Sequence, residues 1–346
     1  MTMELLKRLS EVAGVPGREE AVREIVRGEL EEWADEVETD ILGNVIAVKK
    51  GRGGPKVMVA AHMDEIGFLV SHVGEKSGFL KIDPVGGFDP RVLMAKRVVV
   101  HTESGDLLGV IGSKPVHVLT EEERKQPIEI KDLFIDLGLP GDKVKKRVQV
   151  GDFVTLRQDF VEMGDLVCGK ALDDRVGVYV MIEAVRRVKK HKADIYAVAT
   201  TQEEVGIRGA RVSSYGISPD IGVALDVTVA SDVPGASETD YVTQLSKGVA
   251  IKIKDSLSIS NPKLVRRLRQ LAEKKKIPYQ LEILPRGGTD AGAMQLTKEG
   301  VAAITISIPT RYLHSVVECA HKRDIEAAIK LLAAFLEEAS ERDYSL

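Results

Sequence analysis

The sequence predicts an α/β fold, in which a mixed sheet is flanked by helices and carries an inserted small β-barrel-like domain. Near both ends of the chain, short apolar runs alternate with helical patterns of apolar residues, as is typical of such a sheet. Between residues 65 and 157 the helical pattern disappears, and short β-rich runs alternate with glycine turns. The 346 residues also exceed the size of a typical single core. We therefore expect an α/β domain of residues 1–64 and 158–346, with a β-rich domain of residues 65–157 inserted in it.

The first part of the α/β domain begins with two helical patterns. Apolar residues keep helical spacing on both sides of the turn Gly14 to Gly17. Extended chain and a short apolar strand follow them. The expected elements are a helix from Glu4 to Ala13, a helix from Arg18 to Trp33, extended chain from Val37 to Lys49, and a strand from Lys56 to Ala61.

The inserted domain is predicted from closely spaced short strands. Glycines and a Ser104-Gly105-Asp106 hairpin turn separate them. The charged segment Pro115 to Lys131 has few apolar anchors, and we expect a mobile surface loop there. The expected strands are Gly67 to His72, Gly78 to Ile82, Arg97 to Thr102, Leu107 to Ile111 and Asp152 to Leu156.

The α/β pattern returns after the insert. A core-facing helix is expected from Asp174 to Lys190, because its apolar residues form one stripe. Another helix, from Pro262 to Lys276, has a proline in its first turn and stops before Pro278. The pattern resumes with the run Val167 to Leu172. The remaining expected elements are strands from Ile195 to Thr200, Ile221 to Leu225 and Ala302 to Ile308, an extended segment from Gly248 to Ile253, and a helix from roughly Arg323 to Ala339.

Composition excludes several classes of function. The net charge of −4 gives no reason to expect a nucleic acid or an anionic membrane as a partner. No apolar run approaches the ~18 residues of a membrane span, and the first residues lack the apolar core of a signal peptide, so we expect a cytoplasmic protein. Charged residues make up 29% of the chain and asparagine is rare, which is the direction seen in hyperthermophile proteins.

The adjacent carboxylates Glu203 and Glu204 are the most informative feature of the sequence. They follow the apolar run Ile195 to Thr200 and precede Gly206. Two carboxylates at the mouth of a buried strand are costly to keep together unless a cation binds there. Metal-dependent hydrolysis needs one carboxylate as a ligand and another as a general base. The pair therefore favours a metal-dependent hydrolase.

Metal-binding side chains also follow other strand-like runs. Each has an ordinary interpretation as well, namely a structural histidine, a helix cap, a turn residue or a loop histidine. Since an α/β sheet brings strand ends to one edge, together they predict a shared site. These candidates are His62 with Asp64, the pair Asp173-Asp174, Asp226 and His314.

Histidines and carboxylates without thiolates favour zinc, cobalt or manganese over a cysteine-rich structural zinc site. The candidates exceed one tetrahedral shell, which predicts two metal ions bridged by a carboxylate, typically ~3.5–4 Å apart. The two cysteines, Cys168 and Cys319, are too few for a disulfide framework. We interpret both as small buried packing residues rather than nucleophiles.

At these residues the chain resembles the tetrahedral aminopeptidases, dinuclear metallopeptidases related to glutamyl and deblocking aminopeptidases. The motifs occur in the expected order, and the β-rich insert lies in the expected place. The resembling motifs are Ala61-His62-Met63-Asp64, Ala171-Leu172-Asp173-Asp174-Arg175, Gln202-Glu203-Glu204-Val205-Gly206, Leu225-Asp226-Val227-Thr228, Gly287-Gly288-Thr289-Asp290-Ala291 and Arg311-Tyr312-Leu313-His314-Ser315.

The resemblance implies an aminopeptidase that removes N-terminal residues from peptides with two divalent ions, zinc or cobalt, in each subunit. It implies that Asp173 bridges the metals, that His62 and Asp226 complete one shell, and that Glu204 and His314 complete the other. Glu203 is then the catalytic base and Asp64 orients His62. The insert corresponds to a dimerisation domain, and dimers assemble into a hollow tetrahedral dodecamer. No catalytic role is expected for Asp290.

Two other functions compete with this one. A metal-free glycosidase also uses a carboxylate pair, but it leaves His62 and His314 without a role. An inactive binding protein on the same fold has no need of the full ligand set. Glu238 and Asp240, in the loop from Asp232 to Tyr241, suggest a preference for basic N-terminal residues if that loop lines the pocket.

Overall fold

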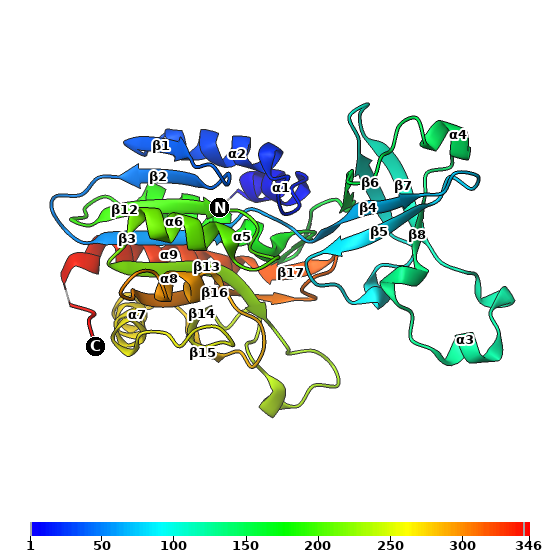
Figure 1. Cartoon of the computed structure of the whole chain (residues 1–346). Helices are drawn as coiled ribbons and strands as arrows, with labels where there is room; N and C mark the ends of the chain where they lie inside the picture. Colours follow the sequence, from blue (N-terminus) through cyan, green and yellow to red (C-terminus); the bar gives the residue numbers. More distant parts are fainter. Residues whose placement is uncertain (1, 342) are drawn as a thin grey trace.

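The computed structural model describes residues 2–341 and 343–346, which form a helix-covered sheet and a separate barrel (Figure 1). The predicted α/β class, with a mixed sheet and an inserted barrel, is confirmed. Within the described part of the chain, every helix is too short or too polar to cross a lipid bilayer.

The central sheet is parallel in its middle and antiparallel at its flanks. In chain order its strands are β1 (Glu36–Thr39), β2 (Val45–Lys49), β3 (Lys56–His62), β10 (Val161–Met163), β11 (Leu166–Gly169), β12 (Asp194–Thr200), β13 (Ile221–Val229), β14 (Val249–Lys254), β15 (Tyr279–Ile283), β16 (Ala302–Arg311) and β17 (Glu318–His321). In space they run β1-β2-β12-β3-β13-β16-β17-β11-β10, and β14 and β15 branch from β16. The parallel pairs β12–β3, β3–β13 and β13–β16 form the middle.

Helices cover both faces of this sheet. Along β3, Val57 and Val59 belong to the larger hydrophobic core, whereas Met58 and Ala60 belong to a smaller core on the opposite face. Burial of both faces explains why this strand is apolar at every position from Val57 to Ala61. The larger core is covered by α1 (Glu4–Glu11), α2 (Glu20–Glu31), α5 (Leu172–Arg187), α7 (Pro262–Lys275) and α9 (Lys322–Glu338), and the smaller one by α6 (Arg208–Ile217) and α8 (Asp290–Gln295).

The barrel has its own hydrophobic core, which includes Phe68, Leu80 and Val154. Its strands lie within the predicted range of 65–157, and the exact domain boundaries stay a prediction. They close in the order β4 (Gly67–Val73), β5 (Leu80–Val85), β8 (Phe134–Asp136), β7 (Leu107–Gly112), β6 (Arg97–His101) and β9 (Phe153–Leu156). Short helices decorate it, namely η1 (Pro90–Val92), η2 (Val116–Val118), α3 (Glu121–Lys125), η3 (Ile130–Asp132) and α4 (Gly141–Val144).

Some local expectations differ from the structure. The segment expected to be a mobile surface loop contains α3, because Thr120 and Glu123 form a reciprocal capping box at its start. The strand expected to end at Leu225 continues to Val229, which places Asp226 inside β13. Pairing with β16 extends the strand through this position, and that contact is invisible in the local sequence. Several other elements were not predicted, among them α6, α8, β8, β10, β15 and β17.

Candidate metal centre

The candidate site lies where the parallel strands end at their carboxyl edge. His62 is the last residue of β3 and pairs in register with Thr200, the last residue of β12. Glu203 and Glu204 follow the end of β12 after two intervening residues. This edge is where α/β sheets generally bind ligands.

His62 is held on both of its ring nitrogens. The ring is only 2% exposed. Its Nδ1 lies 3.0 Å from the backbone oxygen of Asp64 and 3.6 Å from a carboxylate oxygen of the same residue. Its Nε2 lies 3.0 Å from Oδ1 of Asp173. A ring fixed through one nitrogen presents the other to a metal ion in a defined direction.

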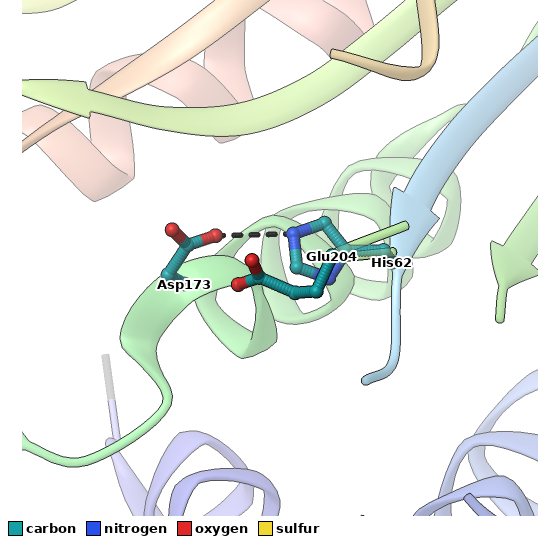
Figure 2. Close-up of side chains that lie close together, drawn as sticks. All are labelled: His62, Asp173 and Glu204. Carbon is teal, nitrogen blue, oxygen red and sulfur yellow. Dashed lines mark hydrogen bonds and ion pairs between the residues drawn. The ribbon is translucent and has the colours of Figure 1, made fainter. Parts of the chain in front are cut away.

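Asp173 lies between two histidines. While its Oδ1 faces His62, its Oδ2 lies 3.4 Å from Nε2 of His314. That same histidine nitrogen lies 3.5 Å from Oε1 of Glu204. Figure 2 shows His62, Asp173 and Glu204 directed toward one another, and one ligand atom from each lies within 4.8 Å of the others. The two oxygens of Asp173 thus face different imidazoles.

His314 reaches the cluster from the loop after β16. Its backbone φ of +58° is in the left-handed region, which a histidine adopts only at some steric cost. The ring Nδ1 lies 2.7 Å from the backbone oxygen of Gly87, a residue in the segment between β5 and β6 of the barrel. The barrel therefore takes part in fixing a residue of the candidate site.

Burial and like charges give the carboxylates unusual proton affinities. Burial raises the pKa of Glu204 to about 7, and Asp173 adds to that shift. Burial likewise raises the pKa of Glu203 and of Asp226 well above their usual range, and Asp173 contributes at Asp226. At Asp173 burial opposes ionisation, but the hydrogen bonds of His314 and His62 lower its pKa. Several buried carboxylates close together carry a large electrostatic cost when they ionise, and a bound cation would offset that cost.

The donor set fits a divalent metal. An imidazole nitrogen and carboxylate oxygens, without thiolates, suit zinc, cobalt or manganese. A small cavity of about 10 Å³, lined among others by Asp173, Glu204 and His314, adjoins them. Asp226, also predicted as a ligand, is buried nearby on β13. The individual ligand roles remain predictions.

The sequence interpretation missed Glu318, which binds the backbone of two candidate site residues. This buried carboxylate on β17 accepts hydrogen bonds from the backbone amides of Asp173, at 3.0 Å, and His314, at 2.8 Å. Burial and Asp173 raise its pKa to about 8. Its only signal in the sequence is its place four residues after His314, which does not distinguish it from any other glutamate.

A buried ionic group next to the site was also missed. Lys170 donates to both carboxylate oxygens of Glu65, at 2.8 and 2.7 Å. Nη2 of Arg175 lies 3.6 Å from the same carboxylate, and its Nε donates to the backbone oxygen of Met63 at 2.6 Å. These contacts fix the chain on both sides of Asp64.

Asp290 is buried at the start of α8 and belongs to the same acidic surroundings. Its Oδ2 accepts a hydrogen bond from the hydroxyl of Thr200 at 2.6 Å. Its Oδ1 has no hydrogen-bond partner among the described residues. Burial raises the pKa of Asp290 to about 6.

Comparison with known proteins agrees with this site. Residues 43–331 match the M42 glutamyl aminopeptidase family. A lysyl aminopeptidase of Pyrococcus furiosus is 41% identical over 99% of both chains. The solved structure of aminopeptidase APDkam598 from Desulfurococcus kamchatkensis is 46% identical, covers 98% of this chain and 95% of its own, and has a TM-score of 0.94. The TET1 peptidase of Pyrococcus horikoshii, described as assembling into a tetrahedron or an octahedral shell, is 34% identical, covers 97% and 99%, and has a TM-score of 0.87.

These matches span both the central sheet and the barrel, and they confirm the resemblance seen in the motifs. The chain therefore belongs to the M42 glutamyl aminopeptidase family and is a hydrolase of the aminopeptidase class.

Proposed function

We propose that this protein removes N-terminal residues from peptides by hydrolysis at a centre of two divalent metal ions. The observation that carries the proposal is the position of Asp173. Its Oδ1 faces Nε2 of His62 and its Oδ2 faces Nε2 of His314. A carboxylate that bridges two metal ions needs this arrangement, with one oxygen for each ion.

The remaining candidates complete the two shells. His62 and Asp226 would hold one ion with Asp173, and Glu204 and His314 would hold the other. When bound, the ions supply a water of lowered pKa and polarise the peptide carbonyl. We assign zinc or cobalt, because both accept this set of nitrogen and oxygen ligands.

Glu203 is proposed as the general base. Its carboxylate takes the proton from the attacking water and passes it to the leaving amine. Burial, which raises the pKa of this group, suits it to holding a proton during the reaction. Asp64 contributes its backbone oxygen to His62 and its carboxylate to the amides of Glu203 and Glu204.

A chelator and one variant test this function. EDTA should abolish cleavage of aminoacyl chromogenic substrates, and adding back zinc or cobalt should restore it. Glu203→Gln should keep its metal, measured by mass spectrometry, while kcat falls on the order of 10²–10⁴-fold. Aminoacyl cleavage that persists after complete metal removal would contradict the metal mechanism. A metal-free glycosidase would instead show a glycoside-cleaving activity that EDTA spares.

We further propose a preference for basic N-terminal residues. The loop with Glu238 begins at Asp232, whose carboxylate binds the guanidinium of Arg311 at 2.9 and 2.7 Å. Because Arg311 ends β16 just before His314, this ion pair anchors the loop near the candidate site. The name of the lysyl aminopeptidase relative agrees with this preference. Equal kcat/KM for lysyl and leucyl substrates would contradict it.

Assembly through the barrel is also proposed. The TET1 relative is described as forming closed shells, and the barrel here exposes apolar side chains that a monomer leaves in water. The finer expectations of a dodecamer, a cytoplasmic location and a thermophilic source stay predictions.

A further inference from the structure

We propose that Glu19 is a positioning residue for the reaction, because its carboxylate fixes the segment that carries Glu203 and Glu204. The inference rests on the proposed function, in which these two residues act as base and ligand. Glu19 lies far from them in the sequence, just before α2, and it touches neither of their side chains in any contact of the described chain.

The segment after β12 is held in an unusual way. Four successive backbone amides donate to side chains from distant parts of the chain, instead of to a neighbouring strand. The contacts are Thr201 to Oδ1 of Asn44 at 3.0 Å, Gln202 to Oε1 of Glu19 at 3.1 Å, Glu203 to Oδ1 of Asp64 at 3.0 Å, and Glu204 to Oδ2 of Asp64 at 3.0 Å.

Gln202 is the point at which this segment turns. Its φ of +55° lies in the left-handed region, so the backbone changes direction immediately before Glu203. A residue with a side chain stays in this conformation only when its surroundings impose it. Its backbone oxygen accepts from the amide of Arg208 at 3.2 Å, and its amide donates to Glu19. Glu19 thus fixes the backbone amide of Gln202, and with it the turn that sets the direction of Glu203.

Glu19 is itself immobilised. The residue is 1% exposed, and the same Oε1 accepts the backbone amide of Gly17 at 2.9 Å. Its backbone oxygen accepts the amide of Arg23 in the first turn of α2 at 2.9 Å. A residue that orients a catalytic group from outside the site must itself be held in place, and Glu19 meets this condition.

Two charged groups face the Glu19 carboxylate from other elements, namely Asp64 and Arg175. Asp64 and Glu19 therefore act side by side, each as an acceptor for amides of one segment. Positioning by Glu19 depends on its oxygen as an acceptor rather than on its charge. A glutamine retains an acceptor at the same reach, an aspartate retains the charge but is shorter, and an alanine retains neither.

The test compares Glu19→Ala, Glu19→Asp and Glu19→Gln, with Glu20→Ala as the matched control, because Glu20 is the exposed neighbour. Steady-state kinetics are measured with an aminoacyl chromogenic substrate, metal content by mass spectrometry and folding by thermal melting. We expect kcat to fall on the order of 10–100-fold in the alanine and aspartate variants, with KM within about twofold and metal content unchanged. The kcat of the glutamine variant should be at least about tenfold higher than that of the alanine and aspartate variants, and the kcat of Glu20→Ala should match the wild type.

Two results would overturn the proposal: a folded alanine or aspartate variant with wild-type kcat, or a glutamine variant as slow as the aspartate variant. If Glu19→Ala fails to fold, the comparison of aspartate with glutamine still decides. Glu203→Gln, measured alongside, separates the two proposals. Retained activity there would refute the role of Glu203 itself, whereas its loss together with unaffected Glu19 variants would refute only the positioning role.

Discussion

The Asp64 carboxylate accepts a hydrogen bond from the backbone amide of Glu203 at 3.0 Å, although 139 positions separate the two residues. Its second oxygen accepts the amide of Glu204 at the same distance. A single buried carboxylate thus sets the direction of both the proposed base and a proposed ligand. Because each oxygen of the Asp64 carboxylate accepts one of the two amides, the carboxylate fixes the positions of both amides together.

Replacing Asp64 should therefore impair turnover more than folding. In Asp64→Ala both amides lose their acceptor, and we expect kcat to fall on the order of 10–100-fold. In Asp64→Asn one amide faces an NH₂ donor instead of an oxygen, so a loss of similar direction is expected. Kinetics and metal content of the purified variants check this. Wild-type kcat in Asp64→Ala would contradict it.

Metal binding to the metal-free protein should release protons near pH 7. Despite burial, the hydrogen bond to Asp173 and the charges of Glu204 and Asp173 raise the pKa of His314 to about 10, and burial raises the pKa of Glu204 to about 7. Without metal, His314 is therefore protonated at neutral pH and must lose its proton to become a ligand. Calorimetric titration with zinc in buffers of different ionisation enthalpy should give at least about one proton per subunit. Affinity should weaken as the pH falls, and binding without proton release would contradict the assignment.

Glu19 should make stability depend on pH. Burial raises its pKa in the folded protein to about 7 from an ordinary 4.5, and Asp64 adds to the shift. The folded state then binds more protons than the unfolded state, so the contribution is complete at low pH and is lost as the pH rises from 4.5 to about 7. Glu19→Gln cannot ionise and should gain on the wild type across this interval, by on the order of 1.4 kcal/mol per pKa unit.

Denaturant unfolding of the wild type and Glu19→Gln at pH 5 and pH 8, both without metal, measures that difference. Because other buried carboxylates titrate in both proteins, only the difference between them reports on Glu19. A difference that does not change between the two pH values would contradict the prediction.

The buried ion pair of Lys252 and Glu282 should be costly to break. Both side chains are fully buried, and Glu282 also accepts the hydroxyl of Thr228 at 2.6 Å. Lys252→Met leaves the carboxylate without its cation, and we expect a loss of about 3–5 kcal/mol of unfolding free energy. The double variant Lys252→Met, Glu282→Leu should recover most of it, since it removes both charges. Equal losses in the single and double variants would contradict this explanation.

The barrel should carry a subunit interface. Leu108 and Val110 on β7 are 53% and 46% exposed, and Val116 and Val118 of η2 are 56% and 60% exposed. Leu108→Glu with Val110→Glu places two charges on this apolar surface and should reduce the mass of the assembly, measured by light scattering after size exclusion. Val212→Glu, an exposed apolar position on α6, is the control. An unchanged mass in the barrel variant would place the interface elsewhere.

Much of the candidate site could be predicted because the relevant signals are local. His62 and the pair Glu203-Glu204 follow apolar strands, and the carboxyl ends of parallel strands meet at one edge of a sheet. Asp226 was predicted as a candidate as well, although its strand proved longer than its apolar run. The β-rich insert was visible from the change in periodicity near residue 65.

By itself the sequence determined which side chains follow the strands, and hence that imidazole and carboxylate groups gather at one edge of the sheet. Only the tertiary structure decided that each oxygen of Asp173 faces a different histidine, that Glu318 supports both Asp173 and His314, and that Glu19 holds the amide of Gln202. The reason is physical. Strand and helix patterns depend on neighbours a few residues away, whereas these contacts join residues from distant segments, and long-range packing alone sets their geometry.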